Sequence, residues 1–191
     1  MMEKKFKDLK INKKLSNTFL IIISGLCVTA IIAIIGIFVI GNRISYFYNT
    51  PYRNAVSATT YRRDLQSTMK NVLCAITTND PAKTEQFLAE AEKDVADQGV
   101  QKEFLKSNSS AKDLLADVEK YSAVVSPIRK QVMDLARNNQ ADEALEMYNN
   151  EYLPATEPLI QTLKDLGAYA ENNATTAYNT ANVIRIVVTI V

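Results

Sequence analysis

The chain has 191 residues, 47% of them hydrophobic, and a formal net charge of +1 at neutral pH. This length suits one domain with a core of its own, and the near-zero charge implies no nucleic-acid partner. Histidine, the commonest general base and metal ligand, is absent, the five glycines form no phosphate-binding motif, and the two cysteines form no CxxC pair, so we expect no catalytic residue, metal, cofactor or enzymatic activity.

The first predicted element is a membrane helix at residues 20–40, LIIISGLCVTAIIAIIGIFVI, which contain no charged side chain. A helix of this length spans about 30 Å of hydrocarbon. A buried core helix and a secretory signal are the alternatives. The run is too long for the apolar part of a signal, and no A-x-A cleavage site precedes Gly41.

The flanks of this run predict its orientation. Six lysines precede it, whereas Arg43 alone follows closely: Lys4, Lys5, Lys7, Lys10, Lys13 and Lys14. Basic flanks stay on the cytoplasmic side, so residues 1–19 form a cytoplasmic basic tail and residues 41–182 form an extracytoplasmic domain. Between residues 42 and 182 there are 15 Lys or Arg and 19 Asp or Glu, which gives the outer part a mild negative charge.

Helices follow from heptad spacing in the outer segment, and we expect four, at about 43–79, 81–106, 110–138 and from 141 onward. The first seam is Ala58, Tyr61, Leu65, Thr68, Val72 and Ala75. The second is weaker: Leu88, Ala91, Val95 and Leu105, with Gln98 and Lys102 at the missing positions and Gly99 as a candidate break. The third is Leu114, Val118, Tyr121, Val125, Ile128, Val132 and Leu135. The fourth runs from Ile160 through Leu163, Gly167, Ala170 and Ala174 to Val191.

Capping residues and prolines punctuate these helices. Asp80 before Pro81 is typical of a helix start, and Ser110 with Asp113 resembles a capping box. We expect Pro127 to kink its helix without ending it. Pro154 and Pro158 should break or kink the last helix.

The final residues 183–191, VIRIVVTIV, are apolar except for Arg185 and Thr189. We expect them to be the incomplete start of a second membrane helix, with Arg185 held at the outer membrane interface. The helices that join the membrane are then the first and the last. This agreement predicts an all-α fold, an extracytoplasmic antiparallel up-down four-helix bundle flanked by two transmembrane helices.

Charge is sparse on the first and last outer helices. Between residues 54 and 79 only Arg62, Arg63, Asp64 and Lys70 are charged, and from 168 to 182 only Glu171 is. This surface fits a contact between two copies of the chain. A plain solvated face explains the same residues equally well.

Three stretches carry a family resemblance: LKINKKL, FYNTPYRNAVSATTYRRDLQ and ADEALEMYNNEYLPATEPLIQTL. With the basic start and the two membrane segments, they resemble the N-terminal part of a methyl-accepting chemotaxis receptor with a four-helix-bundle sensor domain. The resemblance implies a bacterial cell-membrane protein that is a homodimer, detects an extracellular small molecule and controls a cytoplasmic kinase complex through a C-terminal part beyond Val191. It also implies signalling by small sliding of the last helix.

Two alternatives to this function remain open at the sequence level. The same bundle serves as the input domain of sensor histidine kinases and cyclases. A membrane-anchored structural or adaptor protein without a ligand also fits the pattern, and the sequence after Val191 would discriminate among them.

A candidate ligand site lies where helical rise places Arg62 and Arg63 near the level of Thr156, with Tyr152 close by. Two arginines beside a hydroxyl suit a carboxylate. The alternative is that both are ordinary surface arginines, one of them paired with a neighbouring acid. YRRDLQ does not match the arginine motif of the best-known receptors, so no role is carried over from the family.

Overall fold

The computed structural model describes residues 11–190, and every element in this range is helical. The chain divides into two compact units, one formed by its two ends, up to Ser45 and from Ala177, and the other by Tyr46–Thr176. Most of the predicted basic tail and Val191 lie outside the described residues. The bundle unit falls within the predicted outer domain, 41–182.

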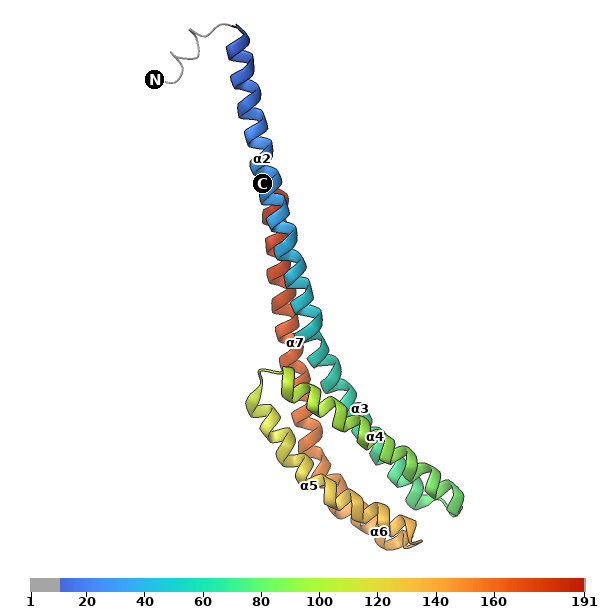
Figure 1. Ribbon diagram of the computed structural model, residues 1–191. Helices are drawn as coiled ribbons and strands as arrows, with labels where there is room; N and C mark the ends of the chain where they lie inside the picture. Colours follow the sequence, from blue (N-terminus) through green and yellow to red (C-terminus); the bar gives the residue numbers. More distant parts are fainter. Residues whose placement is uncertain (1–10, 191) are drawn as a thin grey trace. The chain divides into compact units, whose positions relative to one another are not determined.

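The Tyr46–Thr176 unit is a four-helix bundle in which successive helices run in opposite directions (Figure 1). Its elements are η1 (Tyr48–Tyr52), α3 (Arg53–Thr77), α4 (Pro81–Asn108), α5 (Lys112–Arg137), α6 (Ala141–Met147), η2 (Tyr148–Tyr152) and α7 (Leu153–Ile190). The last three follow one another without a loop and form the fourth helix of the bundle. The all-α, four-helix prediction is confirmed, and the predicted helix ends agree within a few residues.

Local chemistry explains two of the turns. The Asp80 carboxylate accepts a hydrogen bond of 3.0 Å from the Ala82 amide, so Asp80 caps α4 as predicted. Asn139 has a φ of 62° and closes α5, since asparagine tolerates this left-handed conformation well. The Gln140 amide donates to the Leu135 carbonyl across it at 3.0 Å, which is a Schellman arrangement.

The predicted capping box at the start of α5 is wrong. Ala111 is the residue that precedes the helix, and it has no side-chain cap. The Ser110 hydroxyl instead pairs with the Tyr169 hydroxyl of α7 at 3.0 Å, so a contact between helices replaces the local cap. Pro127 lies inside α5 without ending it, as expected.

Two π-helical turns, YNTPY and YNNEY, interrupt the long helices where we expected only proline effects. Around the second, buried side chains recur every four residues: Ala144, Tyr148, Tyr152 and Thr156. A regular helix has 3.6 residues per turn, so this spacing would drift off the core. A wider turn absorbs the excess, and Pro154, which lacks an amide hydrogen, fits directly after it.

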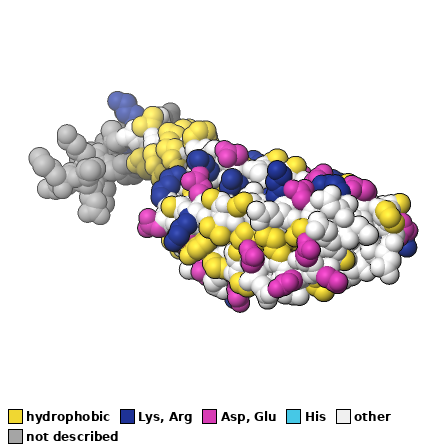
Figure 2. All heavy atoms as spheres, turned by 90° about the horizontal axis from the view of Figure 1, so that it is seen from below, with side chains coloured by type: hydrophobic (Ala, Val, Ile, Leu, Met, Phe, Trp, Pro, Cys, Tyr) yellow, Lys and Arg dark blue, Asp and Glu magenta, His cyan; other side chains and the backbone are white. Residues whose placement is uncertain are grey.

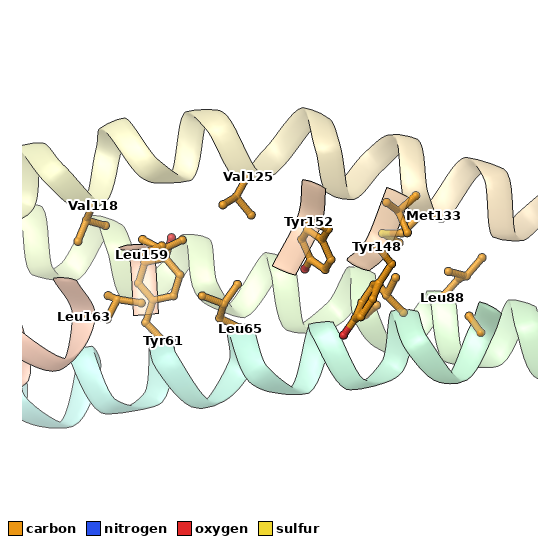
Figure 3. Packing of buried hydrophobic residues seen from close by; sticks show 14 of the residues in the cluster. Tyr61, Leu65, Leu88, Val118, Val125, Met133, Tyr148, Tyr152, Leu159 and Leu163 are labelled. Atoms are coloured by element: carbon orange, nitrogen blue, oxygen red, sulfur yellow. The ribbon is translucent and has the colours of Figure 1, made fainter. Parts of the chain in front are cut away.

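The core of the bundle is a continuous cluster with contributions from all four helices (Figure 3). Every residue of the predicted α3 seam is buried, at 4% exposed or less. The α5 seam is only half right. Val118, Val125 and Val132 are buried as predicted, but Leu115 and Ala136 are buried more deeply than their predicted counterparts Leu114 and Leu135.

Polar side chains occupy the predicted gap in the α4 seam. Gln98 is 5% exposed, and its amide donates to the Thr68 hydroxyl at 2.7 Å. That hydroxyl donates in turn to the Asp64 carbonyl at 2.8 Å. The pair replaces an apolar contact between α3 and α4 with a satisfied hydrogen bond, and α4 continues through Gly99 without the suggested break.

The other unit contains most of α2 (Ile11–Phe47) and the end of α7. One helix among the described residues, Lys13–Thr77, is long and apolar enough to cross a membrane; its most apolar window has a mean hydropathy of 2.9 and is 6% buried. Hydroxyls in the apolar run are satisfied within the helix: Ser24 donates to the Leu20 carbonyl at 2.7 Å, and Thr29 to that of Leu26 at 2.9 Å.

Candidate functional site

The two predicted arginines lie on α3 but face different surroundings. Arg62 is half-buried and lines a groove of about 540 Å³ between α3 and α7, together with Leu163 and Lys164. The Arg63 side chain is 73% exposed and forms a 2.9 Å salt bridge with its neighbour Asp64. Arg63 therefore matches the alternative interpretation, an arginine paired with an adjacent acid.

Tyr152 and Thr156 do not join these arginines in one site. Both are fully buried, and the Thr156 hydroxyl donates to the Leu153 carbonyl at 2.8 Å. Thr156 lies beside Met69, whereas Arg62 shares its groove with Leu163. The predicted common level is thus wrong by about two helical turns, or about 10 Å, because the prediction assumed that α3 and the fourth helix end at the same level. Thr156 is 15 residues into the fourth helix, yet Met69 is only 8 residues from the end of α3. Binding at Arg62 itself stays a prediction.

Arg185, the predicted interface residue, is exposed in the unit formed by the chain ends. Its Nε donates to the Asn182 side-chain oxygen one turn earlier at 3.2 Å. This contact holds the guanidinium back toward the preceding turn of α7. A role at a membrane interface stays a prediction.

A second hollow, which sequence analysis missed, runs between α4 and α5. We call it the α4–α5 groove; it consists of two adjoining hollows of about 460 and 590 Å³ that share Val95, Ala123, Ser126 and Arg129. Its floor is apolar and comes from three helices: Tyr61 and Leu65 of α3, Val125 of α5 and Leu159 of α7. Figure 3 shows Tyr61, Leu65, Val125 and Leu159 close together in the core. The groove therefore reaches all four helices.

Salt bridges join α4 to α5 at both ends of the groove. Lys106 contacts Glu119 at 2.8 Å at one end, and at the other Arg137 contacts Glu85 at 3.1 Å and Glu92 at 3.0 Å. The hydrogen bond with Lys106 lowers the pKa of the Glu119 carboxyl, and the same bond raises the pKa of the Lys106 amine. Each of these three acids thus has a basic partner within salt-bridge distance. Elsewhere basic and acidic side chains are mixed over the face of the bundle in Figure 2.

Arg129 occupies the middle of the groove and belongs to both hollows. Within residues 11–190 it forms no salt bridge, and its one side-chain hydrogen bond is a long contact of 3.4 Å to Ser126. Its charge acts on two phenols of the core. Burial raises the pKa of Tyr61 and of Tyr152, while Arg129 opposes that rise in both.

Small side chains keep the groove open. A Cβ added at Gly99 would meet no heavy atom within 4 Å, and Ser122, Ala123 and Ser126 face it from α5. Gln98, Lys102 and Gly99 were visible in the sequence as gaps in the α4 seam. On α5, residues 115, 122, 129 and 136 are spaced seven apart, and Leu115 and Ala136 are buried. A heptad seam through these four positions has polar residues, Ser122 and Arg129, at its two middle positions.

The chemistry of these residues suits binding. No group of three or more His, Cys, Asp or Glu side chains suitable for a metal converges among the described residues. The groove offers instead one unneutralised guanidinium, several hydroxyl and amide groups and an apolar floor, which together fit a small organic ligand.

Comparison with curated proteins and with solved structures gave no match. Comparison with family models gave one, to the four helix bundle sensory module for signal transduction, over residues 8–184. The match covers all of α2, both π turns, the whole bundle and most of α7. The chain therefore belongs to the family of four-helix-bundle sensory modules for signal transduction, as the resemblance of its sequence indicated.

Proposed function

We propose that this sensory module is the input part of a bacterial transmembrane chemoreceptor. It detects a small molecule outside the cell and passes the signal through a second membrane helix to a cytoplasmic kinase complex. The observation that carries the proposal is the membership of residues 8–184 in a signal-transducing bundle family, combined with an apolar helix that leads into the bundle. A sensor domain that follows such a helix needs a way to report across the membrane.

The apolar run of α2 supports the membrane part of the proposal. Its aliphatic side chains are exposed on the helix surface, with Ile34 at 67% and Ile37 at 71%. Such a surface is unfavourable in water and favourable in lipid. The hydroxyls of Ser24 and Thr29 bond to their own helix, which lipid requires of polar groups.

The continuity of α7 supports the signalling part. A single helix extends from Leu153 to Ile190, and between residues 167 and 186 its buried positions are Ala170 and Ala174. Small side chains interlock little with a neighbour, so they permit short sliding movements. A ligand that favours one position of α7 shifts the equilibrium by its difference in affinity for the two positions.

A homodimer is part of the same proposal. Apolar side chains are exposed on the weakly charged face of η1 and α3, including Tyr52 and Val56, each 46% exposed. They line the groove that also contains Arg62 and Gly167. A second copy of the chain would cover this face through a symmetric contact.

The proposed topology places Lys13 in the cytoplasm and Val100 outside the cell. We expect an impermeant thiol reagent to label Val100→Cys in intact cells and to leave Lys13→Cys unlabelled until the membrane is broken. Cys27 and Cys74 are free thiols, so both would be replaced by alanine first. Labelling of position 13 but not of position 100 in intact cells would reverse the proposed orientation.

Signalling through α7 is tested at Arg185. Residues 1–191 would be joined to the cytoplasmic half of a known chemoreceptor, and kinase activity measured without ligand. Moving a guanidinium into hydrocarbon costs several kcal/mol, so Arg185 should limit inward movement of the helix. We expect Arg185→Leu to change the basal kinase activity by several-fold, while Arg185→Lys keeps it close to the parent. Equal activity in all three chimeras, at equal membrane insertion, would contradict the sliding mechanism.

A further inference from the structure

We propose that the α4–α5 groove is a ligand site contained within one subunit, and that it takes a small organic carboxylate with an apolar body. The inference deepens the proposed function by naming the ligand class and the residues that hold it. It differs from the arginine site predicted on the sequence, because Arg62 and Arg63 lie on another helix and line no part of this groove.

The first argument is the shape of the space between α4 and α5. Salt bridges hold the two helices together at both ends, at Lys106–Glu119 and at Arg137 with Glu85 and Glu92. Between these ends the small residues Gly99 and Ala123 leave space, and the longer side chains that line it, such as Lys102 and Arg129, are polar. Helices that pack closely for stability alone fill such positions with interlocking apolar side chains. Here the two helices leave room for a ligand between the two sets of salt bridges.

The second argument is the charge in the middle of that space. Arg129 is half-buried and has no acidic partner within the described part of the chain. Of the acids that line the groove, Glu119 is engaged by Lys106, and Glu92 and Asp134 by Arg137; Glu103 also lines it and forms no salt bridge among the described residues. A planar guanidinium binds a carboxylate through two parallel hydrogen bonds. An incoming carboxylate would thus gain a partner without displacing one.

The third argument is the apolar lining, which selects the rest of the ligand. Leu65, Val125 and Leu159 are at most 2% exposed and only close the floor, so the apolar surface open to a ligand comes from Val95, which is half-buried, and from Ala123 and Pro127, which are exposed. A hydrated ion such as phosphate would lose water over this surface without compensation. An alkyl or aryl group would bury apolar area there. The Ser122 hydroxyl, which pairs with the Tyr61 hydroxyl at 3.0 Å, stands at the edge of this floor.

The position of Leu159 connects occupancy of the groove to signalling. Leu159 belongs to α7, directly after Pro158, and it meets Tyr61 and Leu65 of α3 at the floor. A ligand that contacts Arg129 rests over the side chains that cover Leu159, so it would favour the packing of α5 against α7 in which those side chains accommodate it. Binding within one subunit would therefore bias the helix that leaves the bundle.

The test uses the full 191-residue chain in lipid nanodiscs, with thermal unfolding followed by circular dichroism. The probes are hexanoate and benzoate, and their neutral amides, hexanamide and benzamide, serve as controls of the same shape. We expect at least one carboxylate to raise the melting temperature, because a ligand that binds only the folded state stabilises it. The matching amide should have at least about tenfold lower affinity, since it lacks the charge-assisted bonds.

Variants assign the effect to a site. Arg129→Gln should weaken carboxylate binding at least about tenfold, Arg129→Lys should weaken it less, and Arg62→Gln, a matched change on α3, should leave it unaltered. Gly99→Leu should abolish binding by filling the groove while the bundle stays folded, because a Cβ there meets open space.

Two results would overturn the proposal. One is a lack of stabilisation by either carboxylate; the other is stabilisation that Arg129→Gln preserves and Arg62→Gln removes. These outcomes are separate from a failure of the proposed function. If Arg185→Leu changes the kinase activity of the chimera but no carboxylate binds, the proposed ligand site is rejected and the proposed receptor function is retained. If a carboxylate binds but the kinase activity of the chimeras never changes, the ligand site is retained and the receptor function is rejected.

Discussion

Replacing Leu166 by alanine is expected to destabilise the bundle by about 2–5 kcal/mol. Leu166 is fully buried, and it is the last large apolar side chain that α7 places in the described core. The buried positions that follow on α7 are Ala170 and Ala174, which are too small to move into the space that a missing leucine leaves. The cavity should therefore stay open, which puts the cost toward the upper part of the range.

Thermal unfolding of the chain in nanodiscs measures this effect. For a unit of this size, the loss corresponds to a fall in melting temperature on the order of 10 °C. The matched control is Leu145→Ala on α6, where the leucine is 37% exposed and the expected loss is below about 1 kcal/mol. Similar falls for the two variants would mean that Leu166 does not belong to the core.

The contrast between α3 and α5 explains how much of the fold the sequence could predict. On α3 one line of residues, from Ala58 to Ala75, is buried throughout and apolar except for Thr68, so its heptad spacing identifies every one of its members. On α5 the buried stripe is wider than one seam and is centred on Val118, Val125 and Val132. Leucines at 114 and 135 drew the predicted seam to one side of that centre. The hydrophobic pattern thus located α5 and its approximate inner face, but not the rotation of the helix about its own axis.

The π turns could not be predicted from periodicity. Each adds a wider turn within an otherwise continuous helix, so neither leaves a gap or a capping residue that sequence analysis could recognise. The two segments do share the pattern Tyr-Asn-x-x-Tyr. The predicted level of Thr156 failed for another reason: the ends of α3 and of the fourth helix are offset, and helical rise along each helix alone does not reveal that offset.

The residues that line the groove correspond to positions where the predicted heptad seams are interrupted. Gln98 and Lys102 interrupt the α4 seam, and Arg129 interrupts the inner face of α5. Each interruption alone fits a polar residue at the edge of a bundle. Only the three-dimensional arrangement shows that they meet across one hollow and that Arg129 lacks an acidic partner among the described residues.

Replacing Tyr152 by phenylalanine is expected to raise the free energy of unfolding by about 1–3 kcal/mol. The side chain is fully buried, and its hydroxyl has no hydrogen-bond partner among the described residues. Phenylalanine keeps the ring, which packs against Tyr148 with centroids 5.5 Å apart, and removes the unsatisfied oxygen. The core should lose no packing and should regain the cost of burying that group.

Tyr148→Phe is the matched control, because it lies in the same π turn and has the opposite hydrogen-bond status. Its hydroxyl donates to the Met69 carbonyl at 3.1 Å. Removing it should lower the free energy of unfolding by about 1 kcal/mol. Denaturant titration of the chain in mild detergent would compare the two variants with the parent at neutral pH.

Alkaline pH gives an independent measure of the buried phenols. Burial raises the pKa of Tyr61, Tyr148 and Tyr152, so the unfolded chain releases these protons at lower pH than the folded chain. Stability that is fully present below the unfolded pKa, about 10, is therefore lost as pH rises above it. Tyr152 is the most deeply buried of the three, so Tyr152→Phe should show a shallower fall than the parent. The opposite result is a Tyr152→Phe variant whose free energy of unfolding is lower than that of the parent at neutral pH and decreases as steeply as the parent's above pH 10. It would show that the hydroxyl is hydrogen-bonded in the folded bundle.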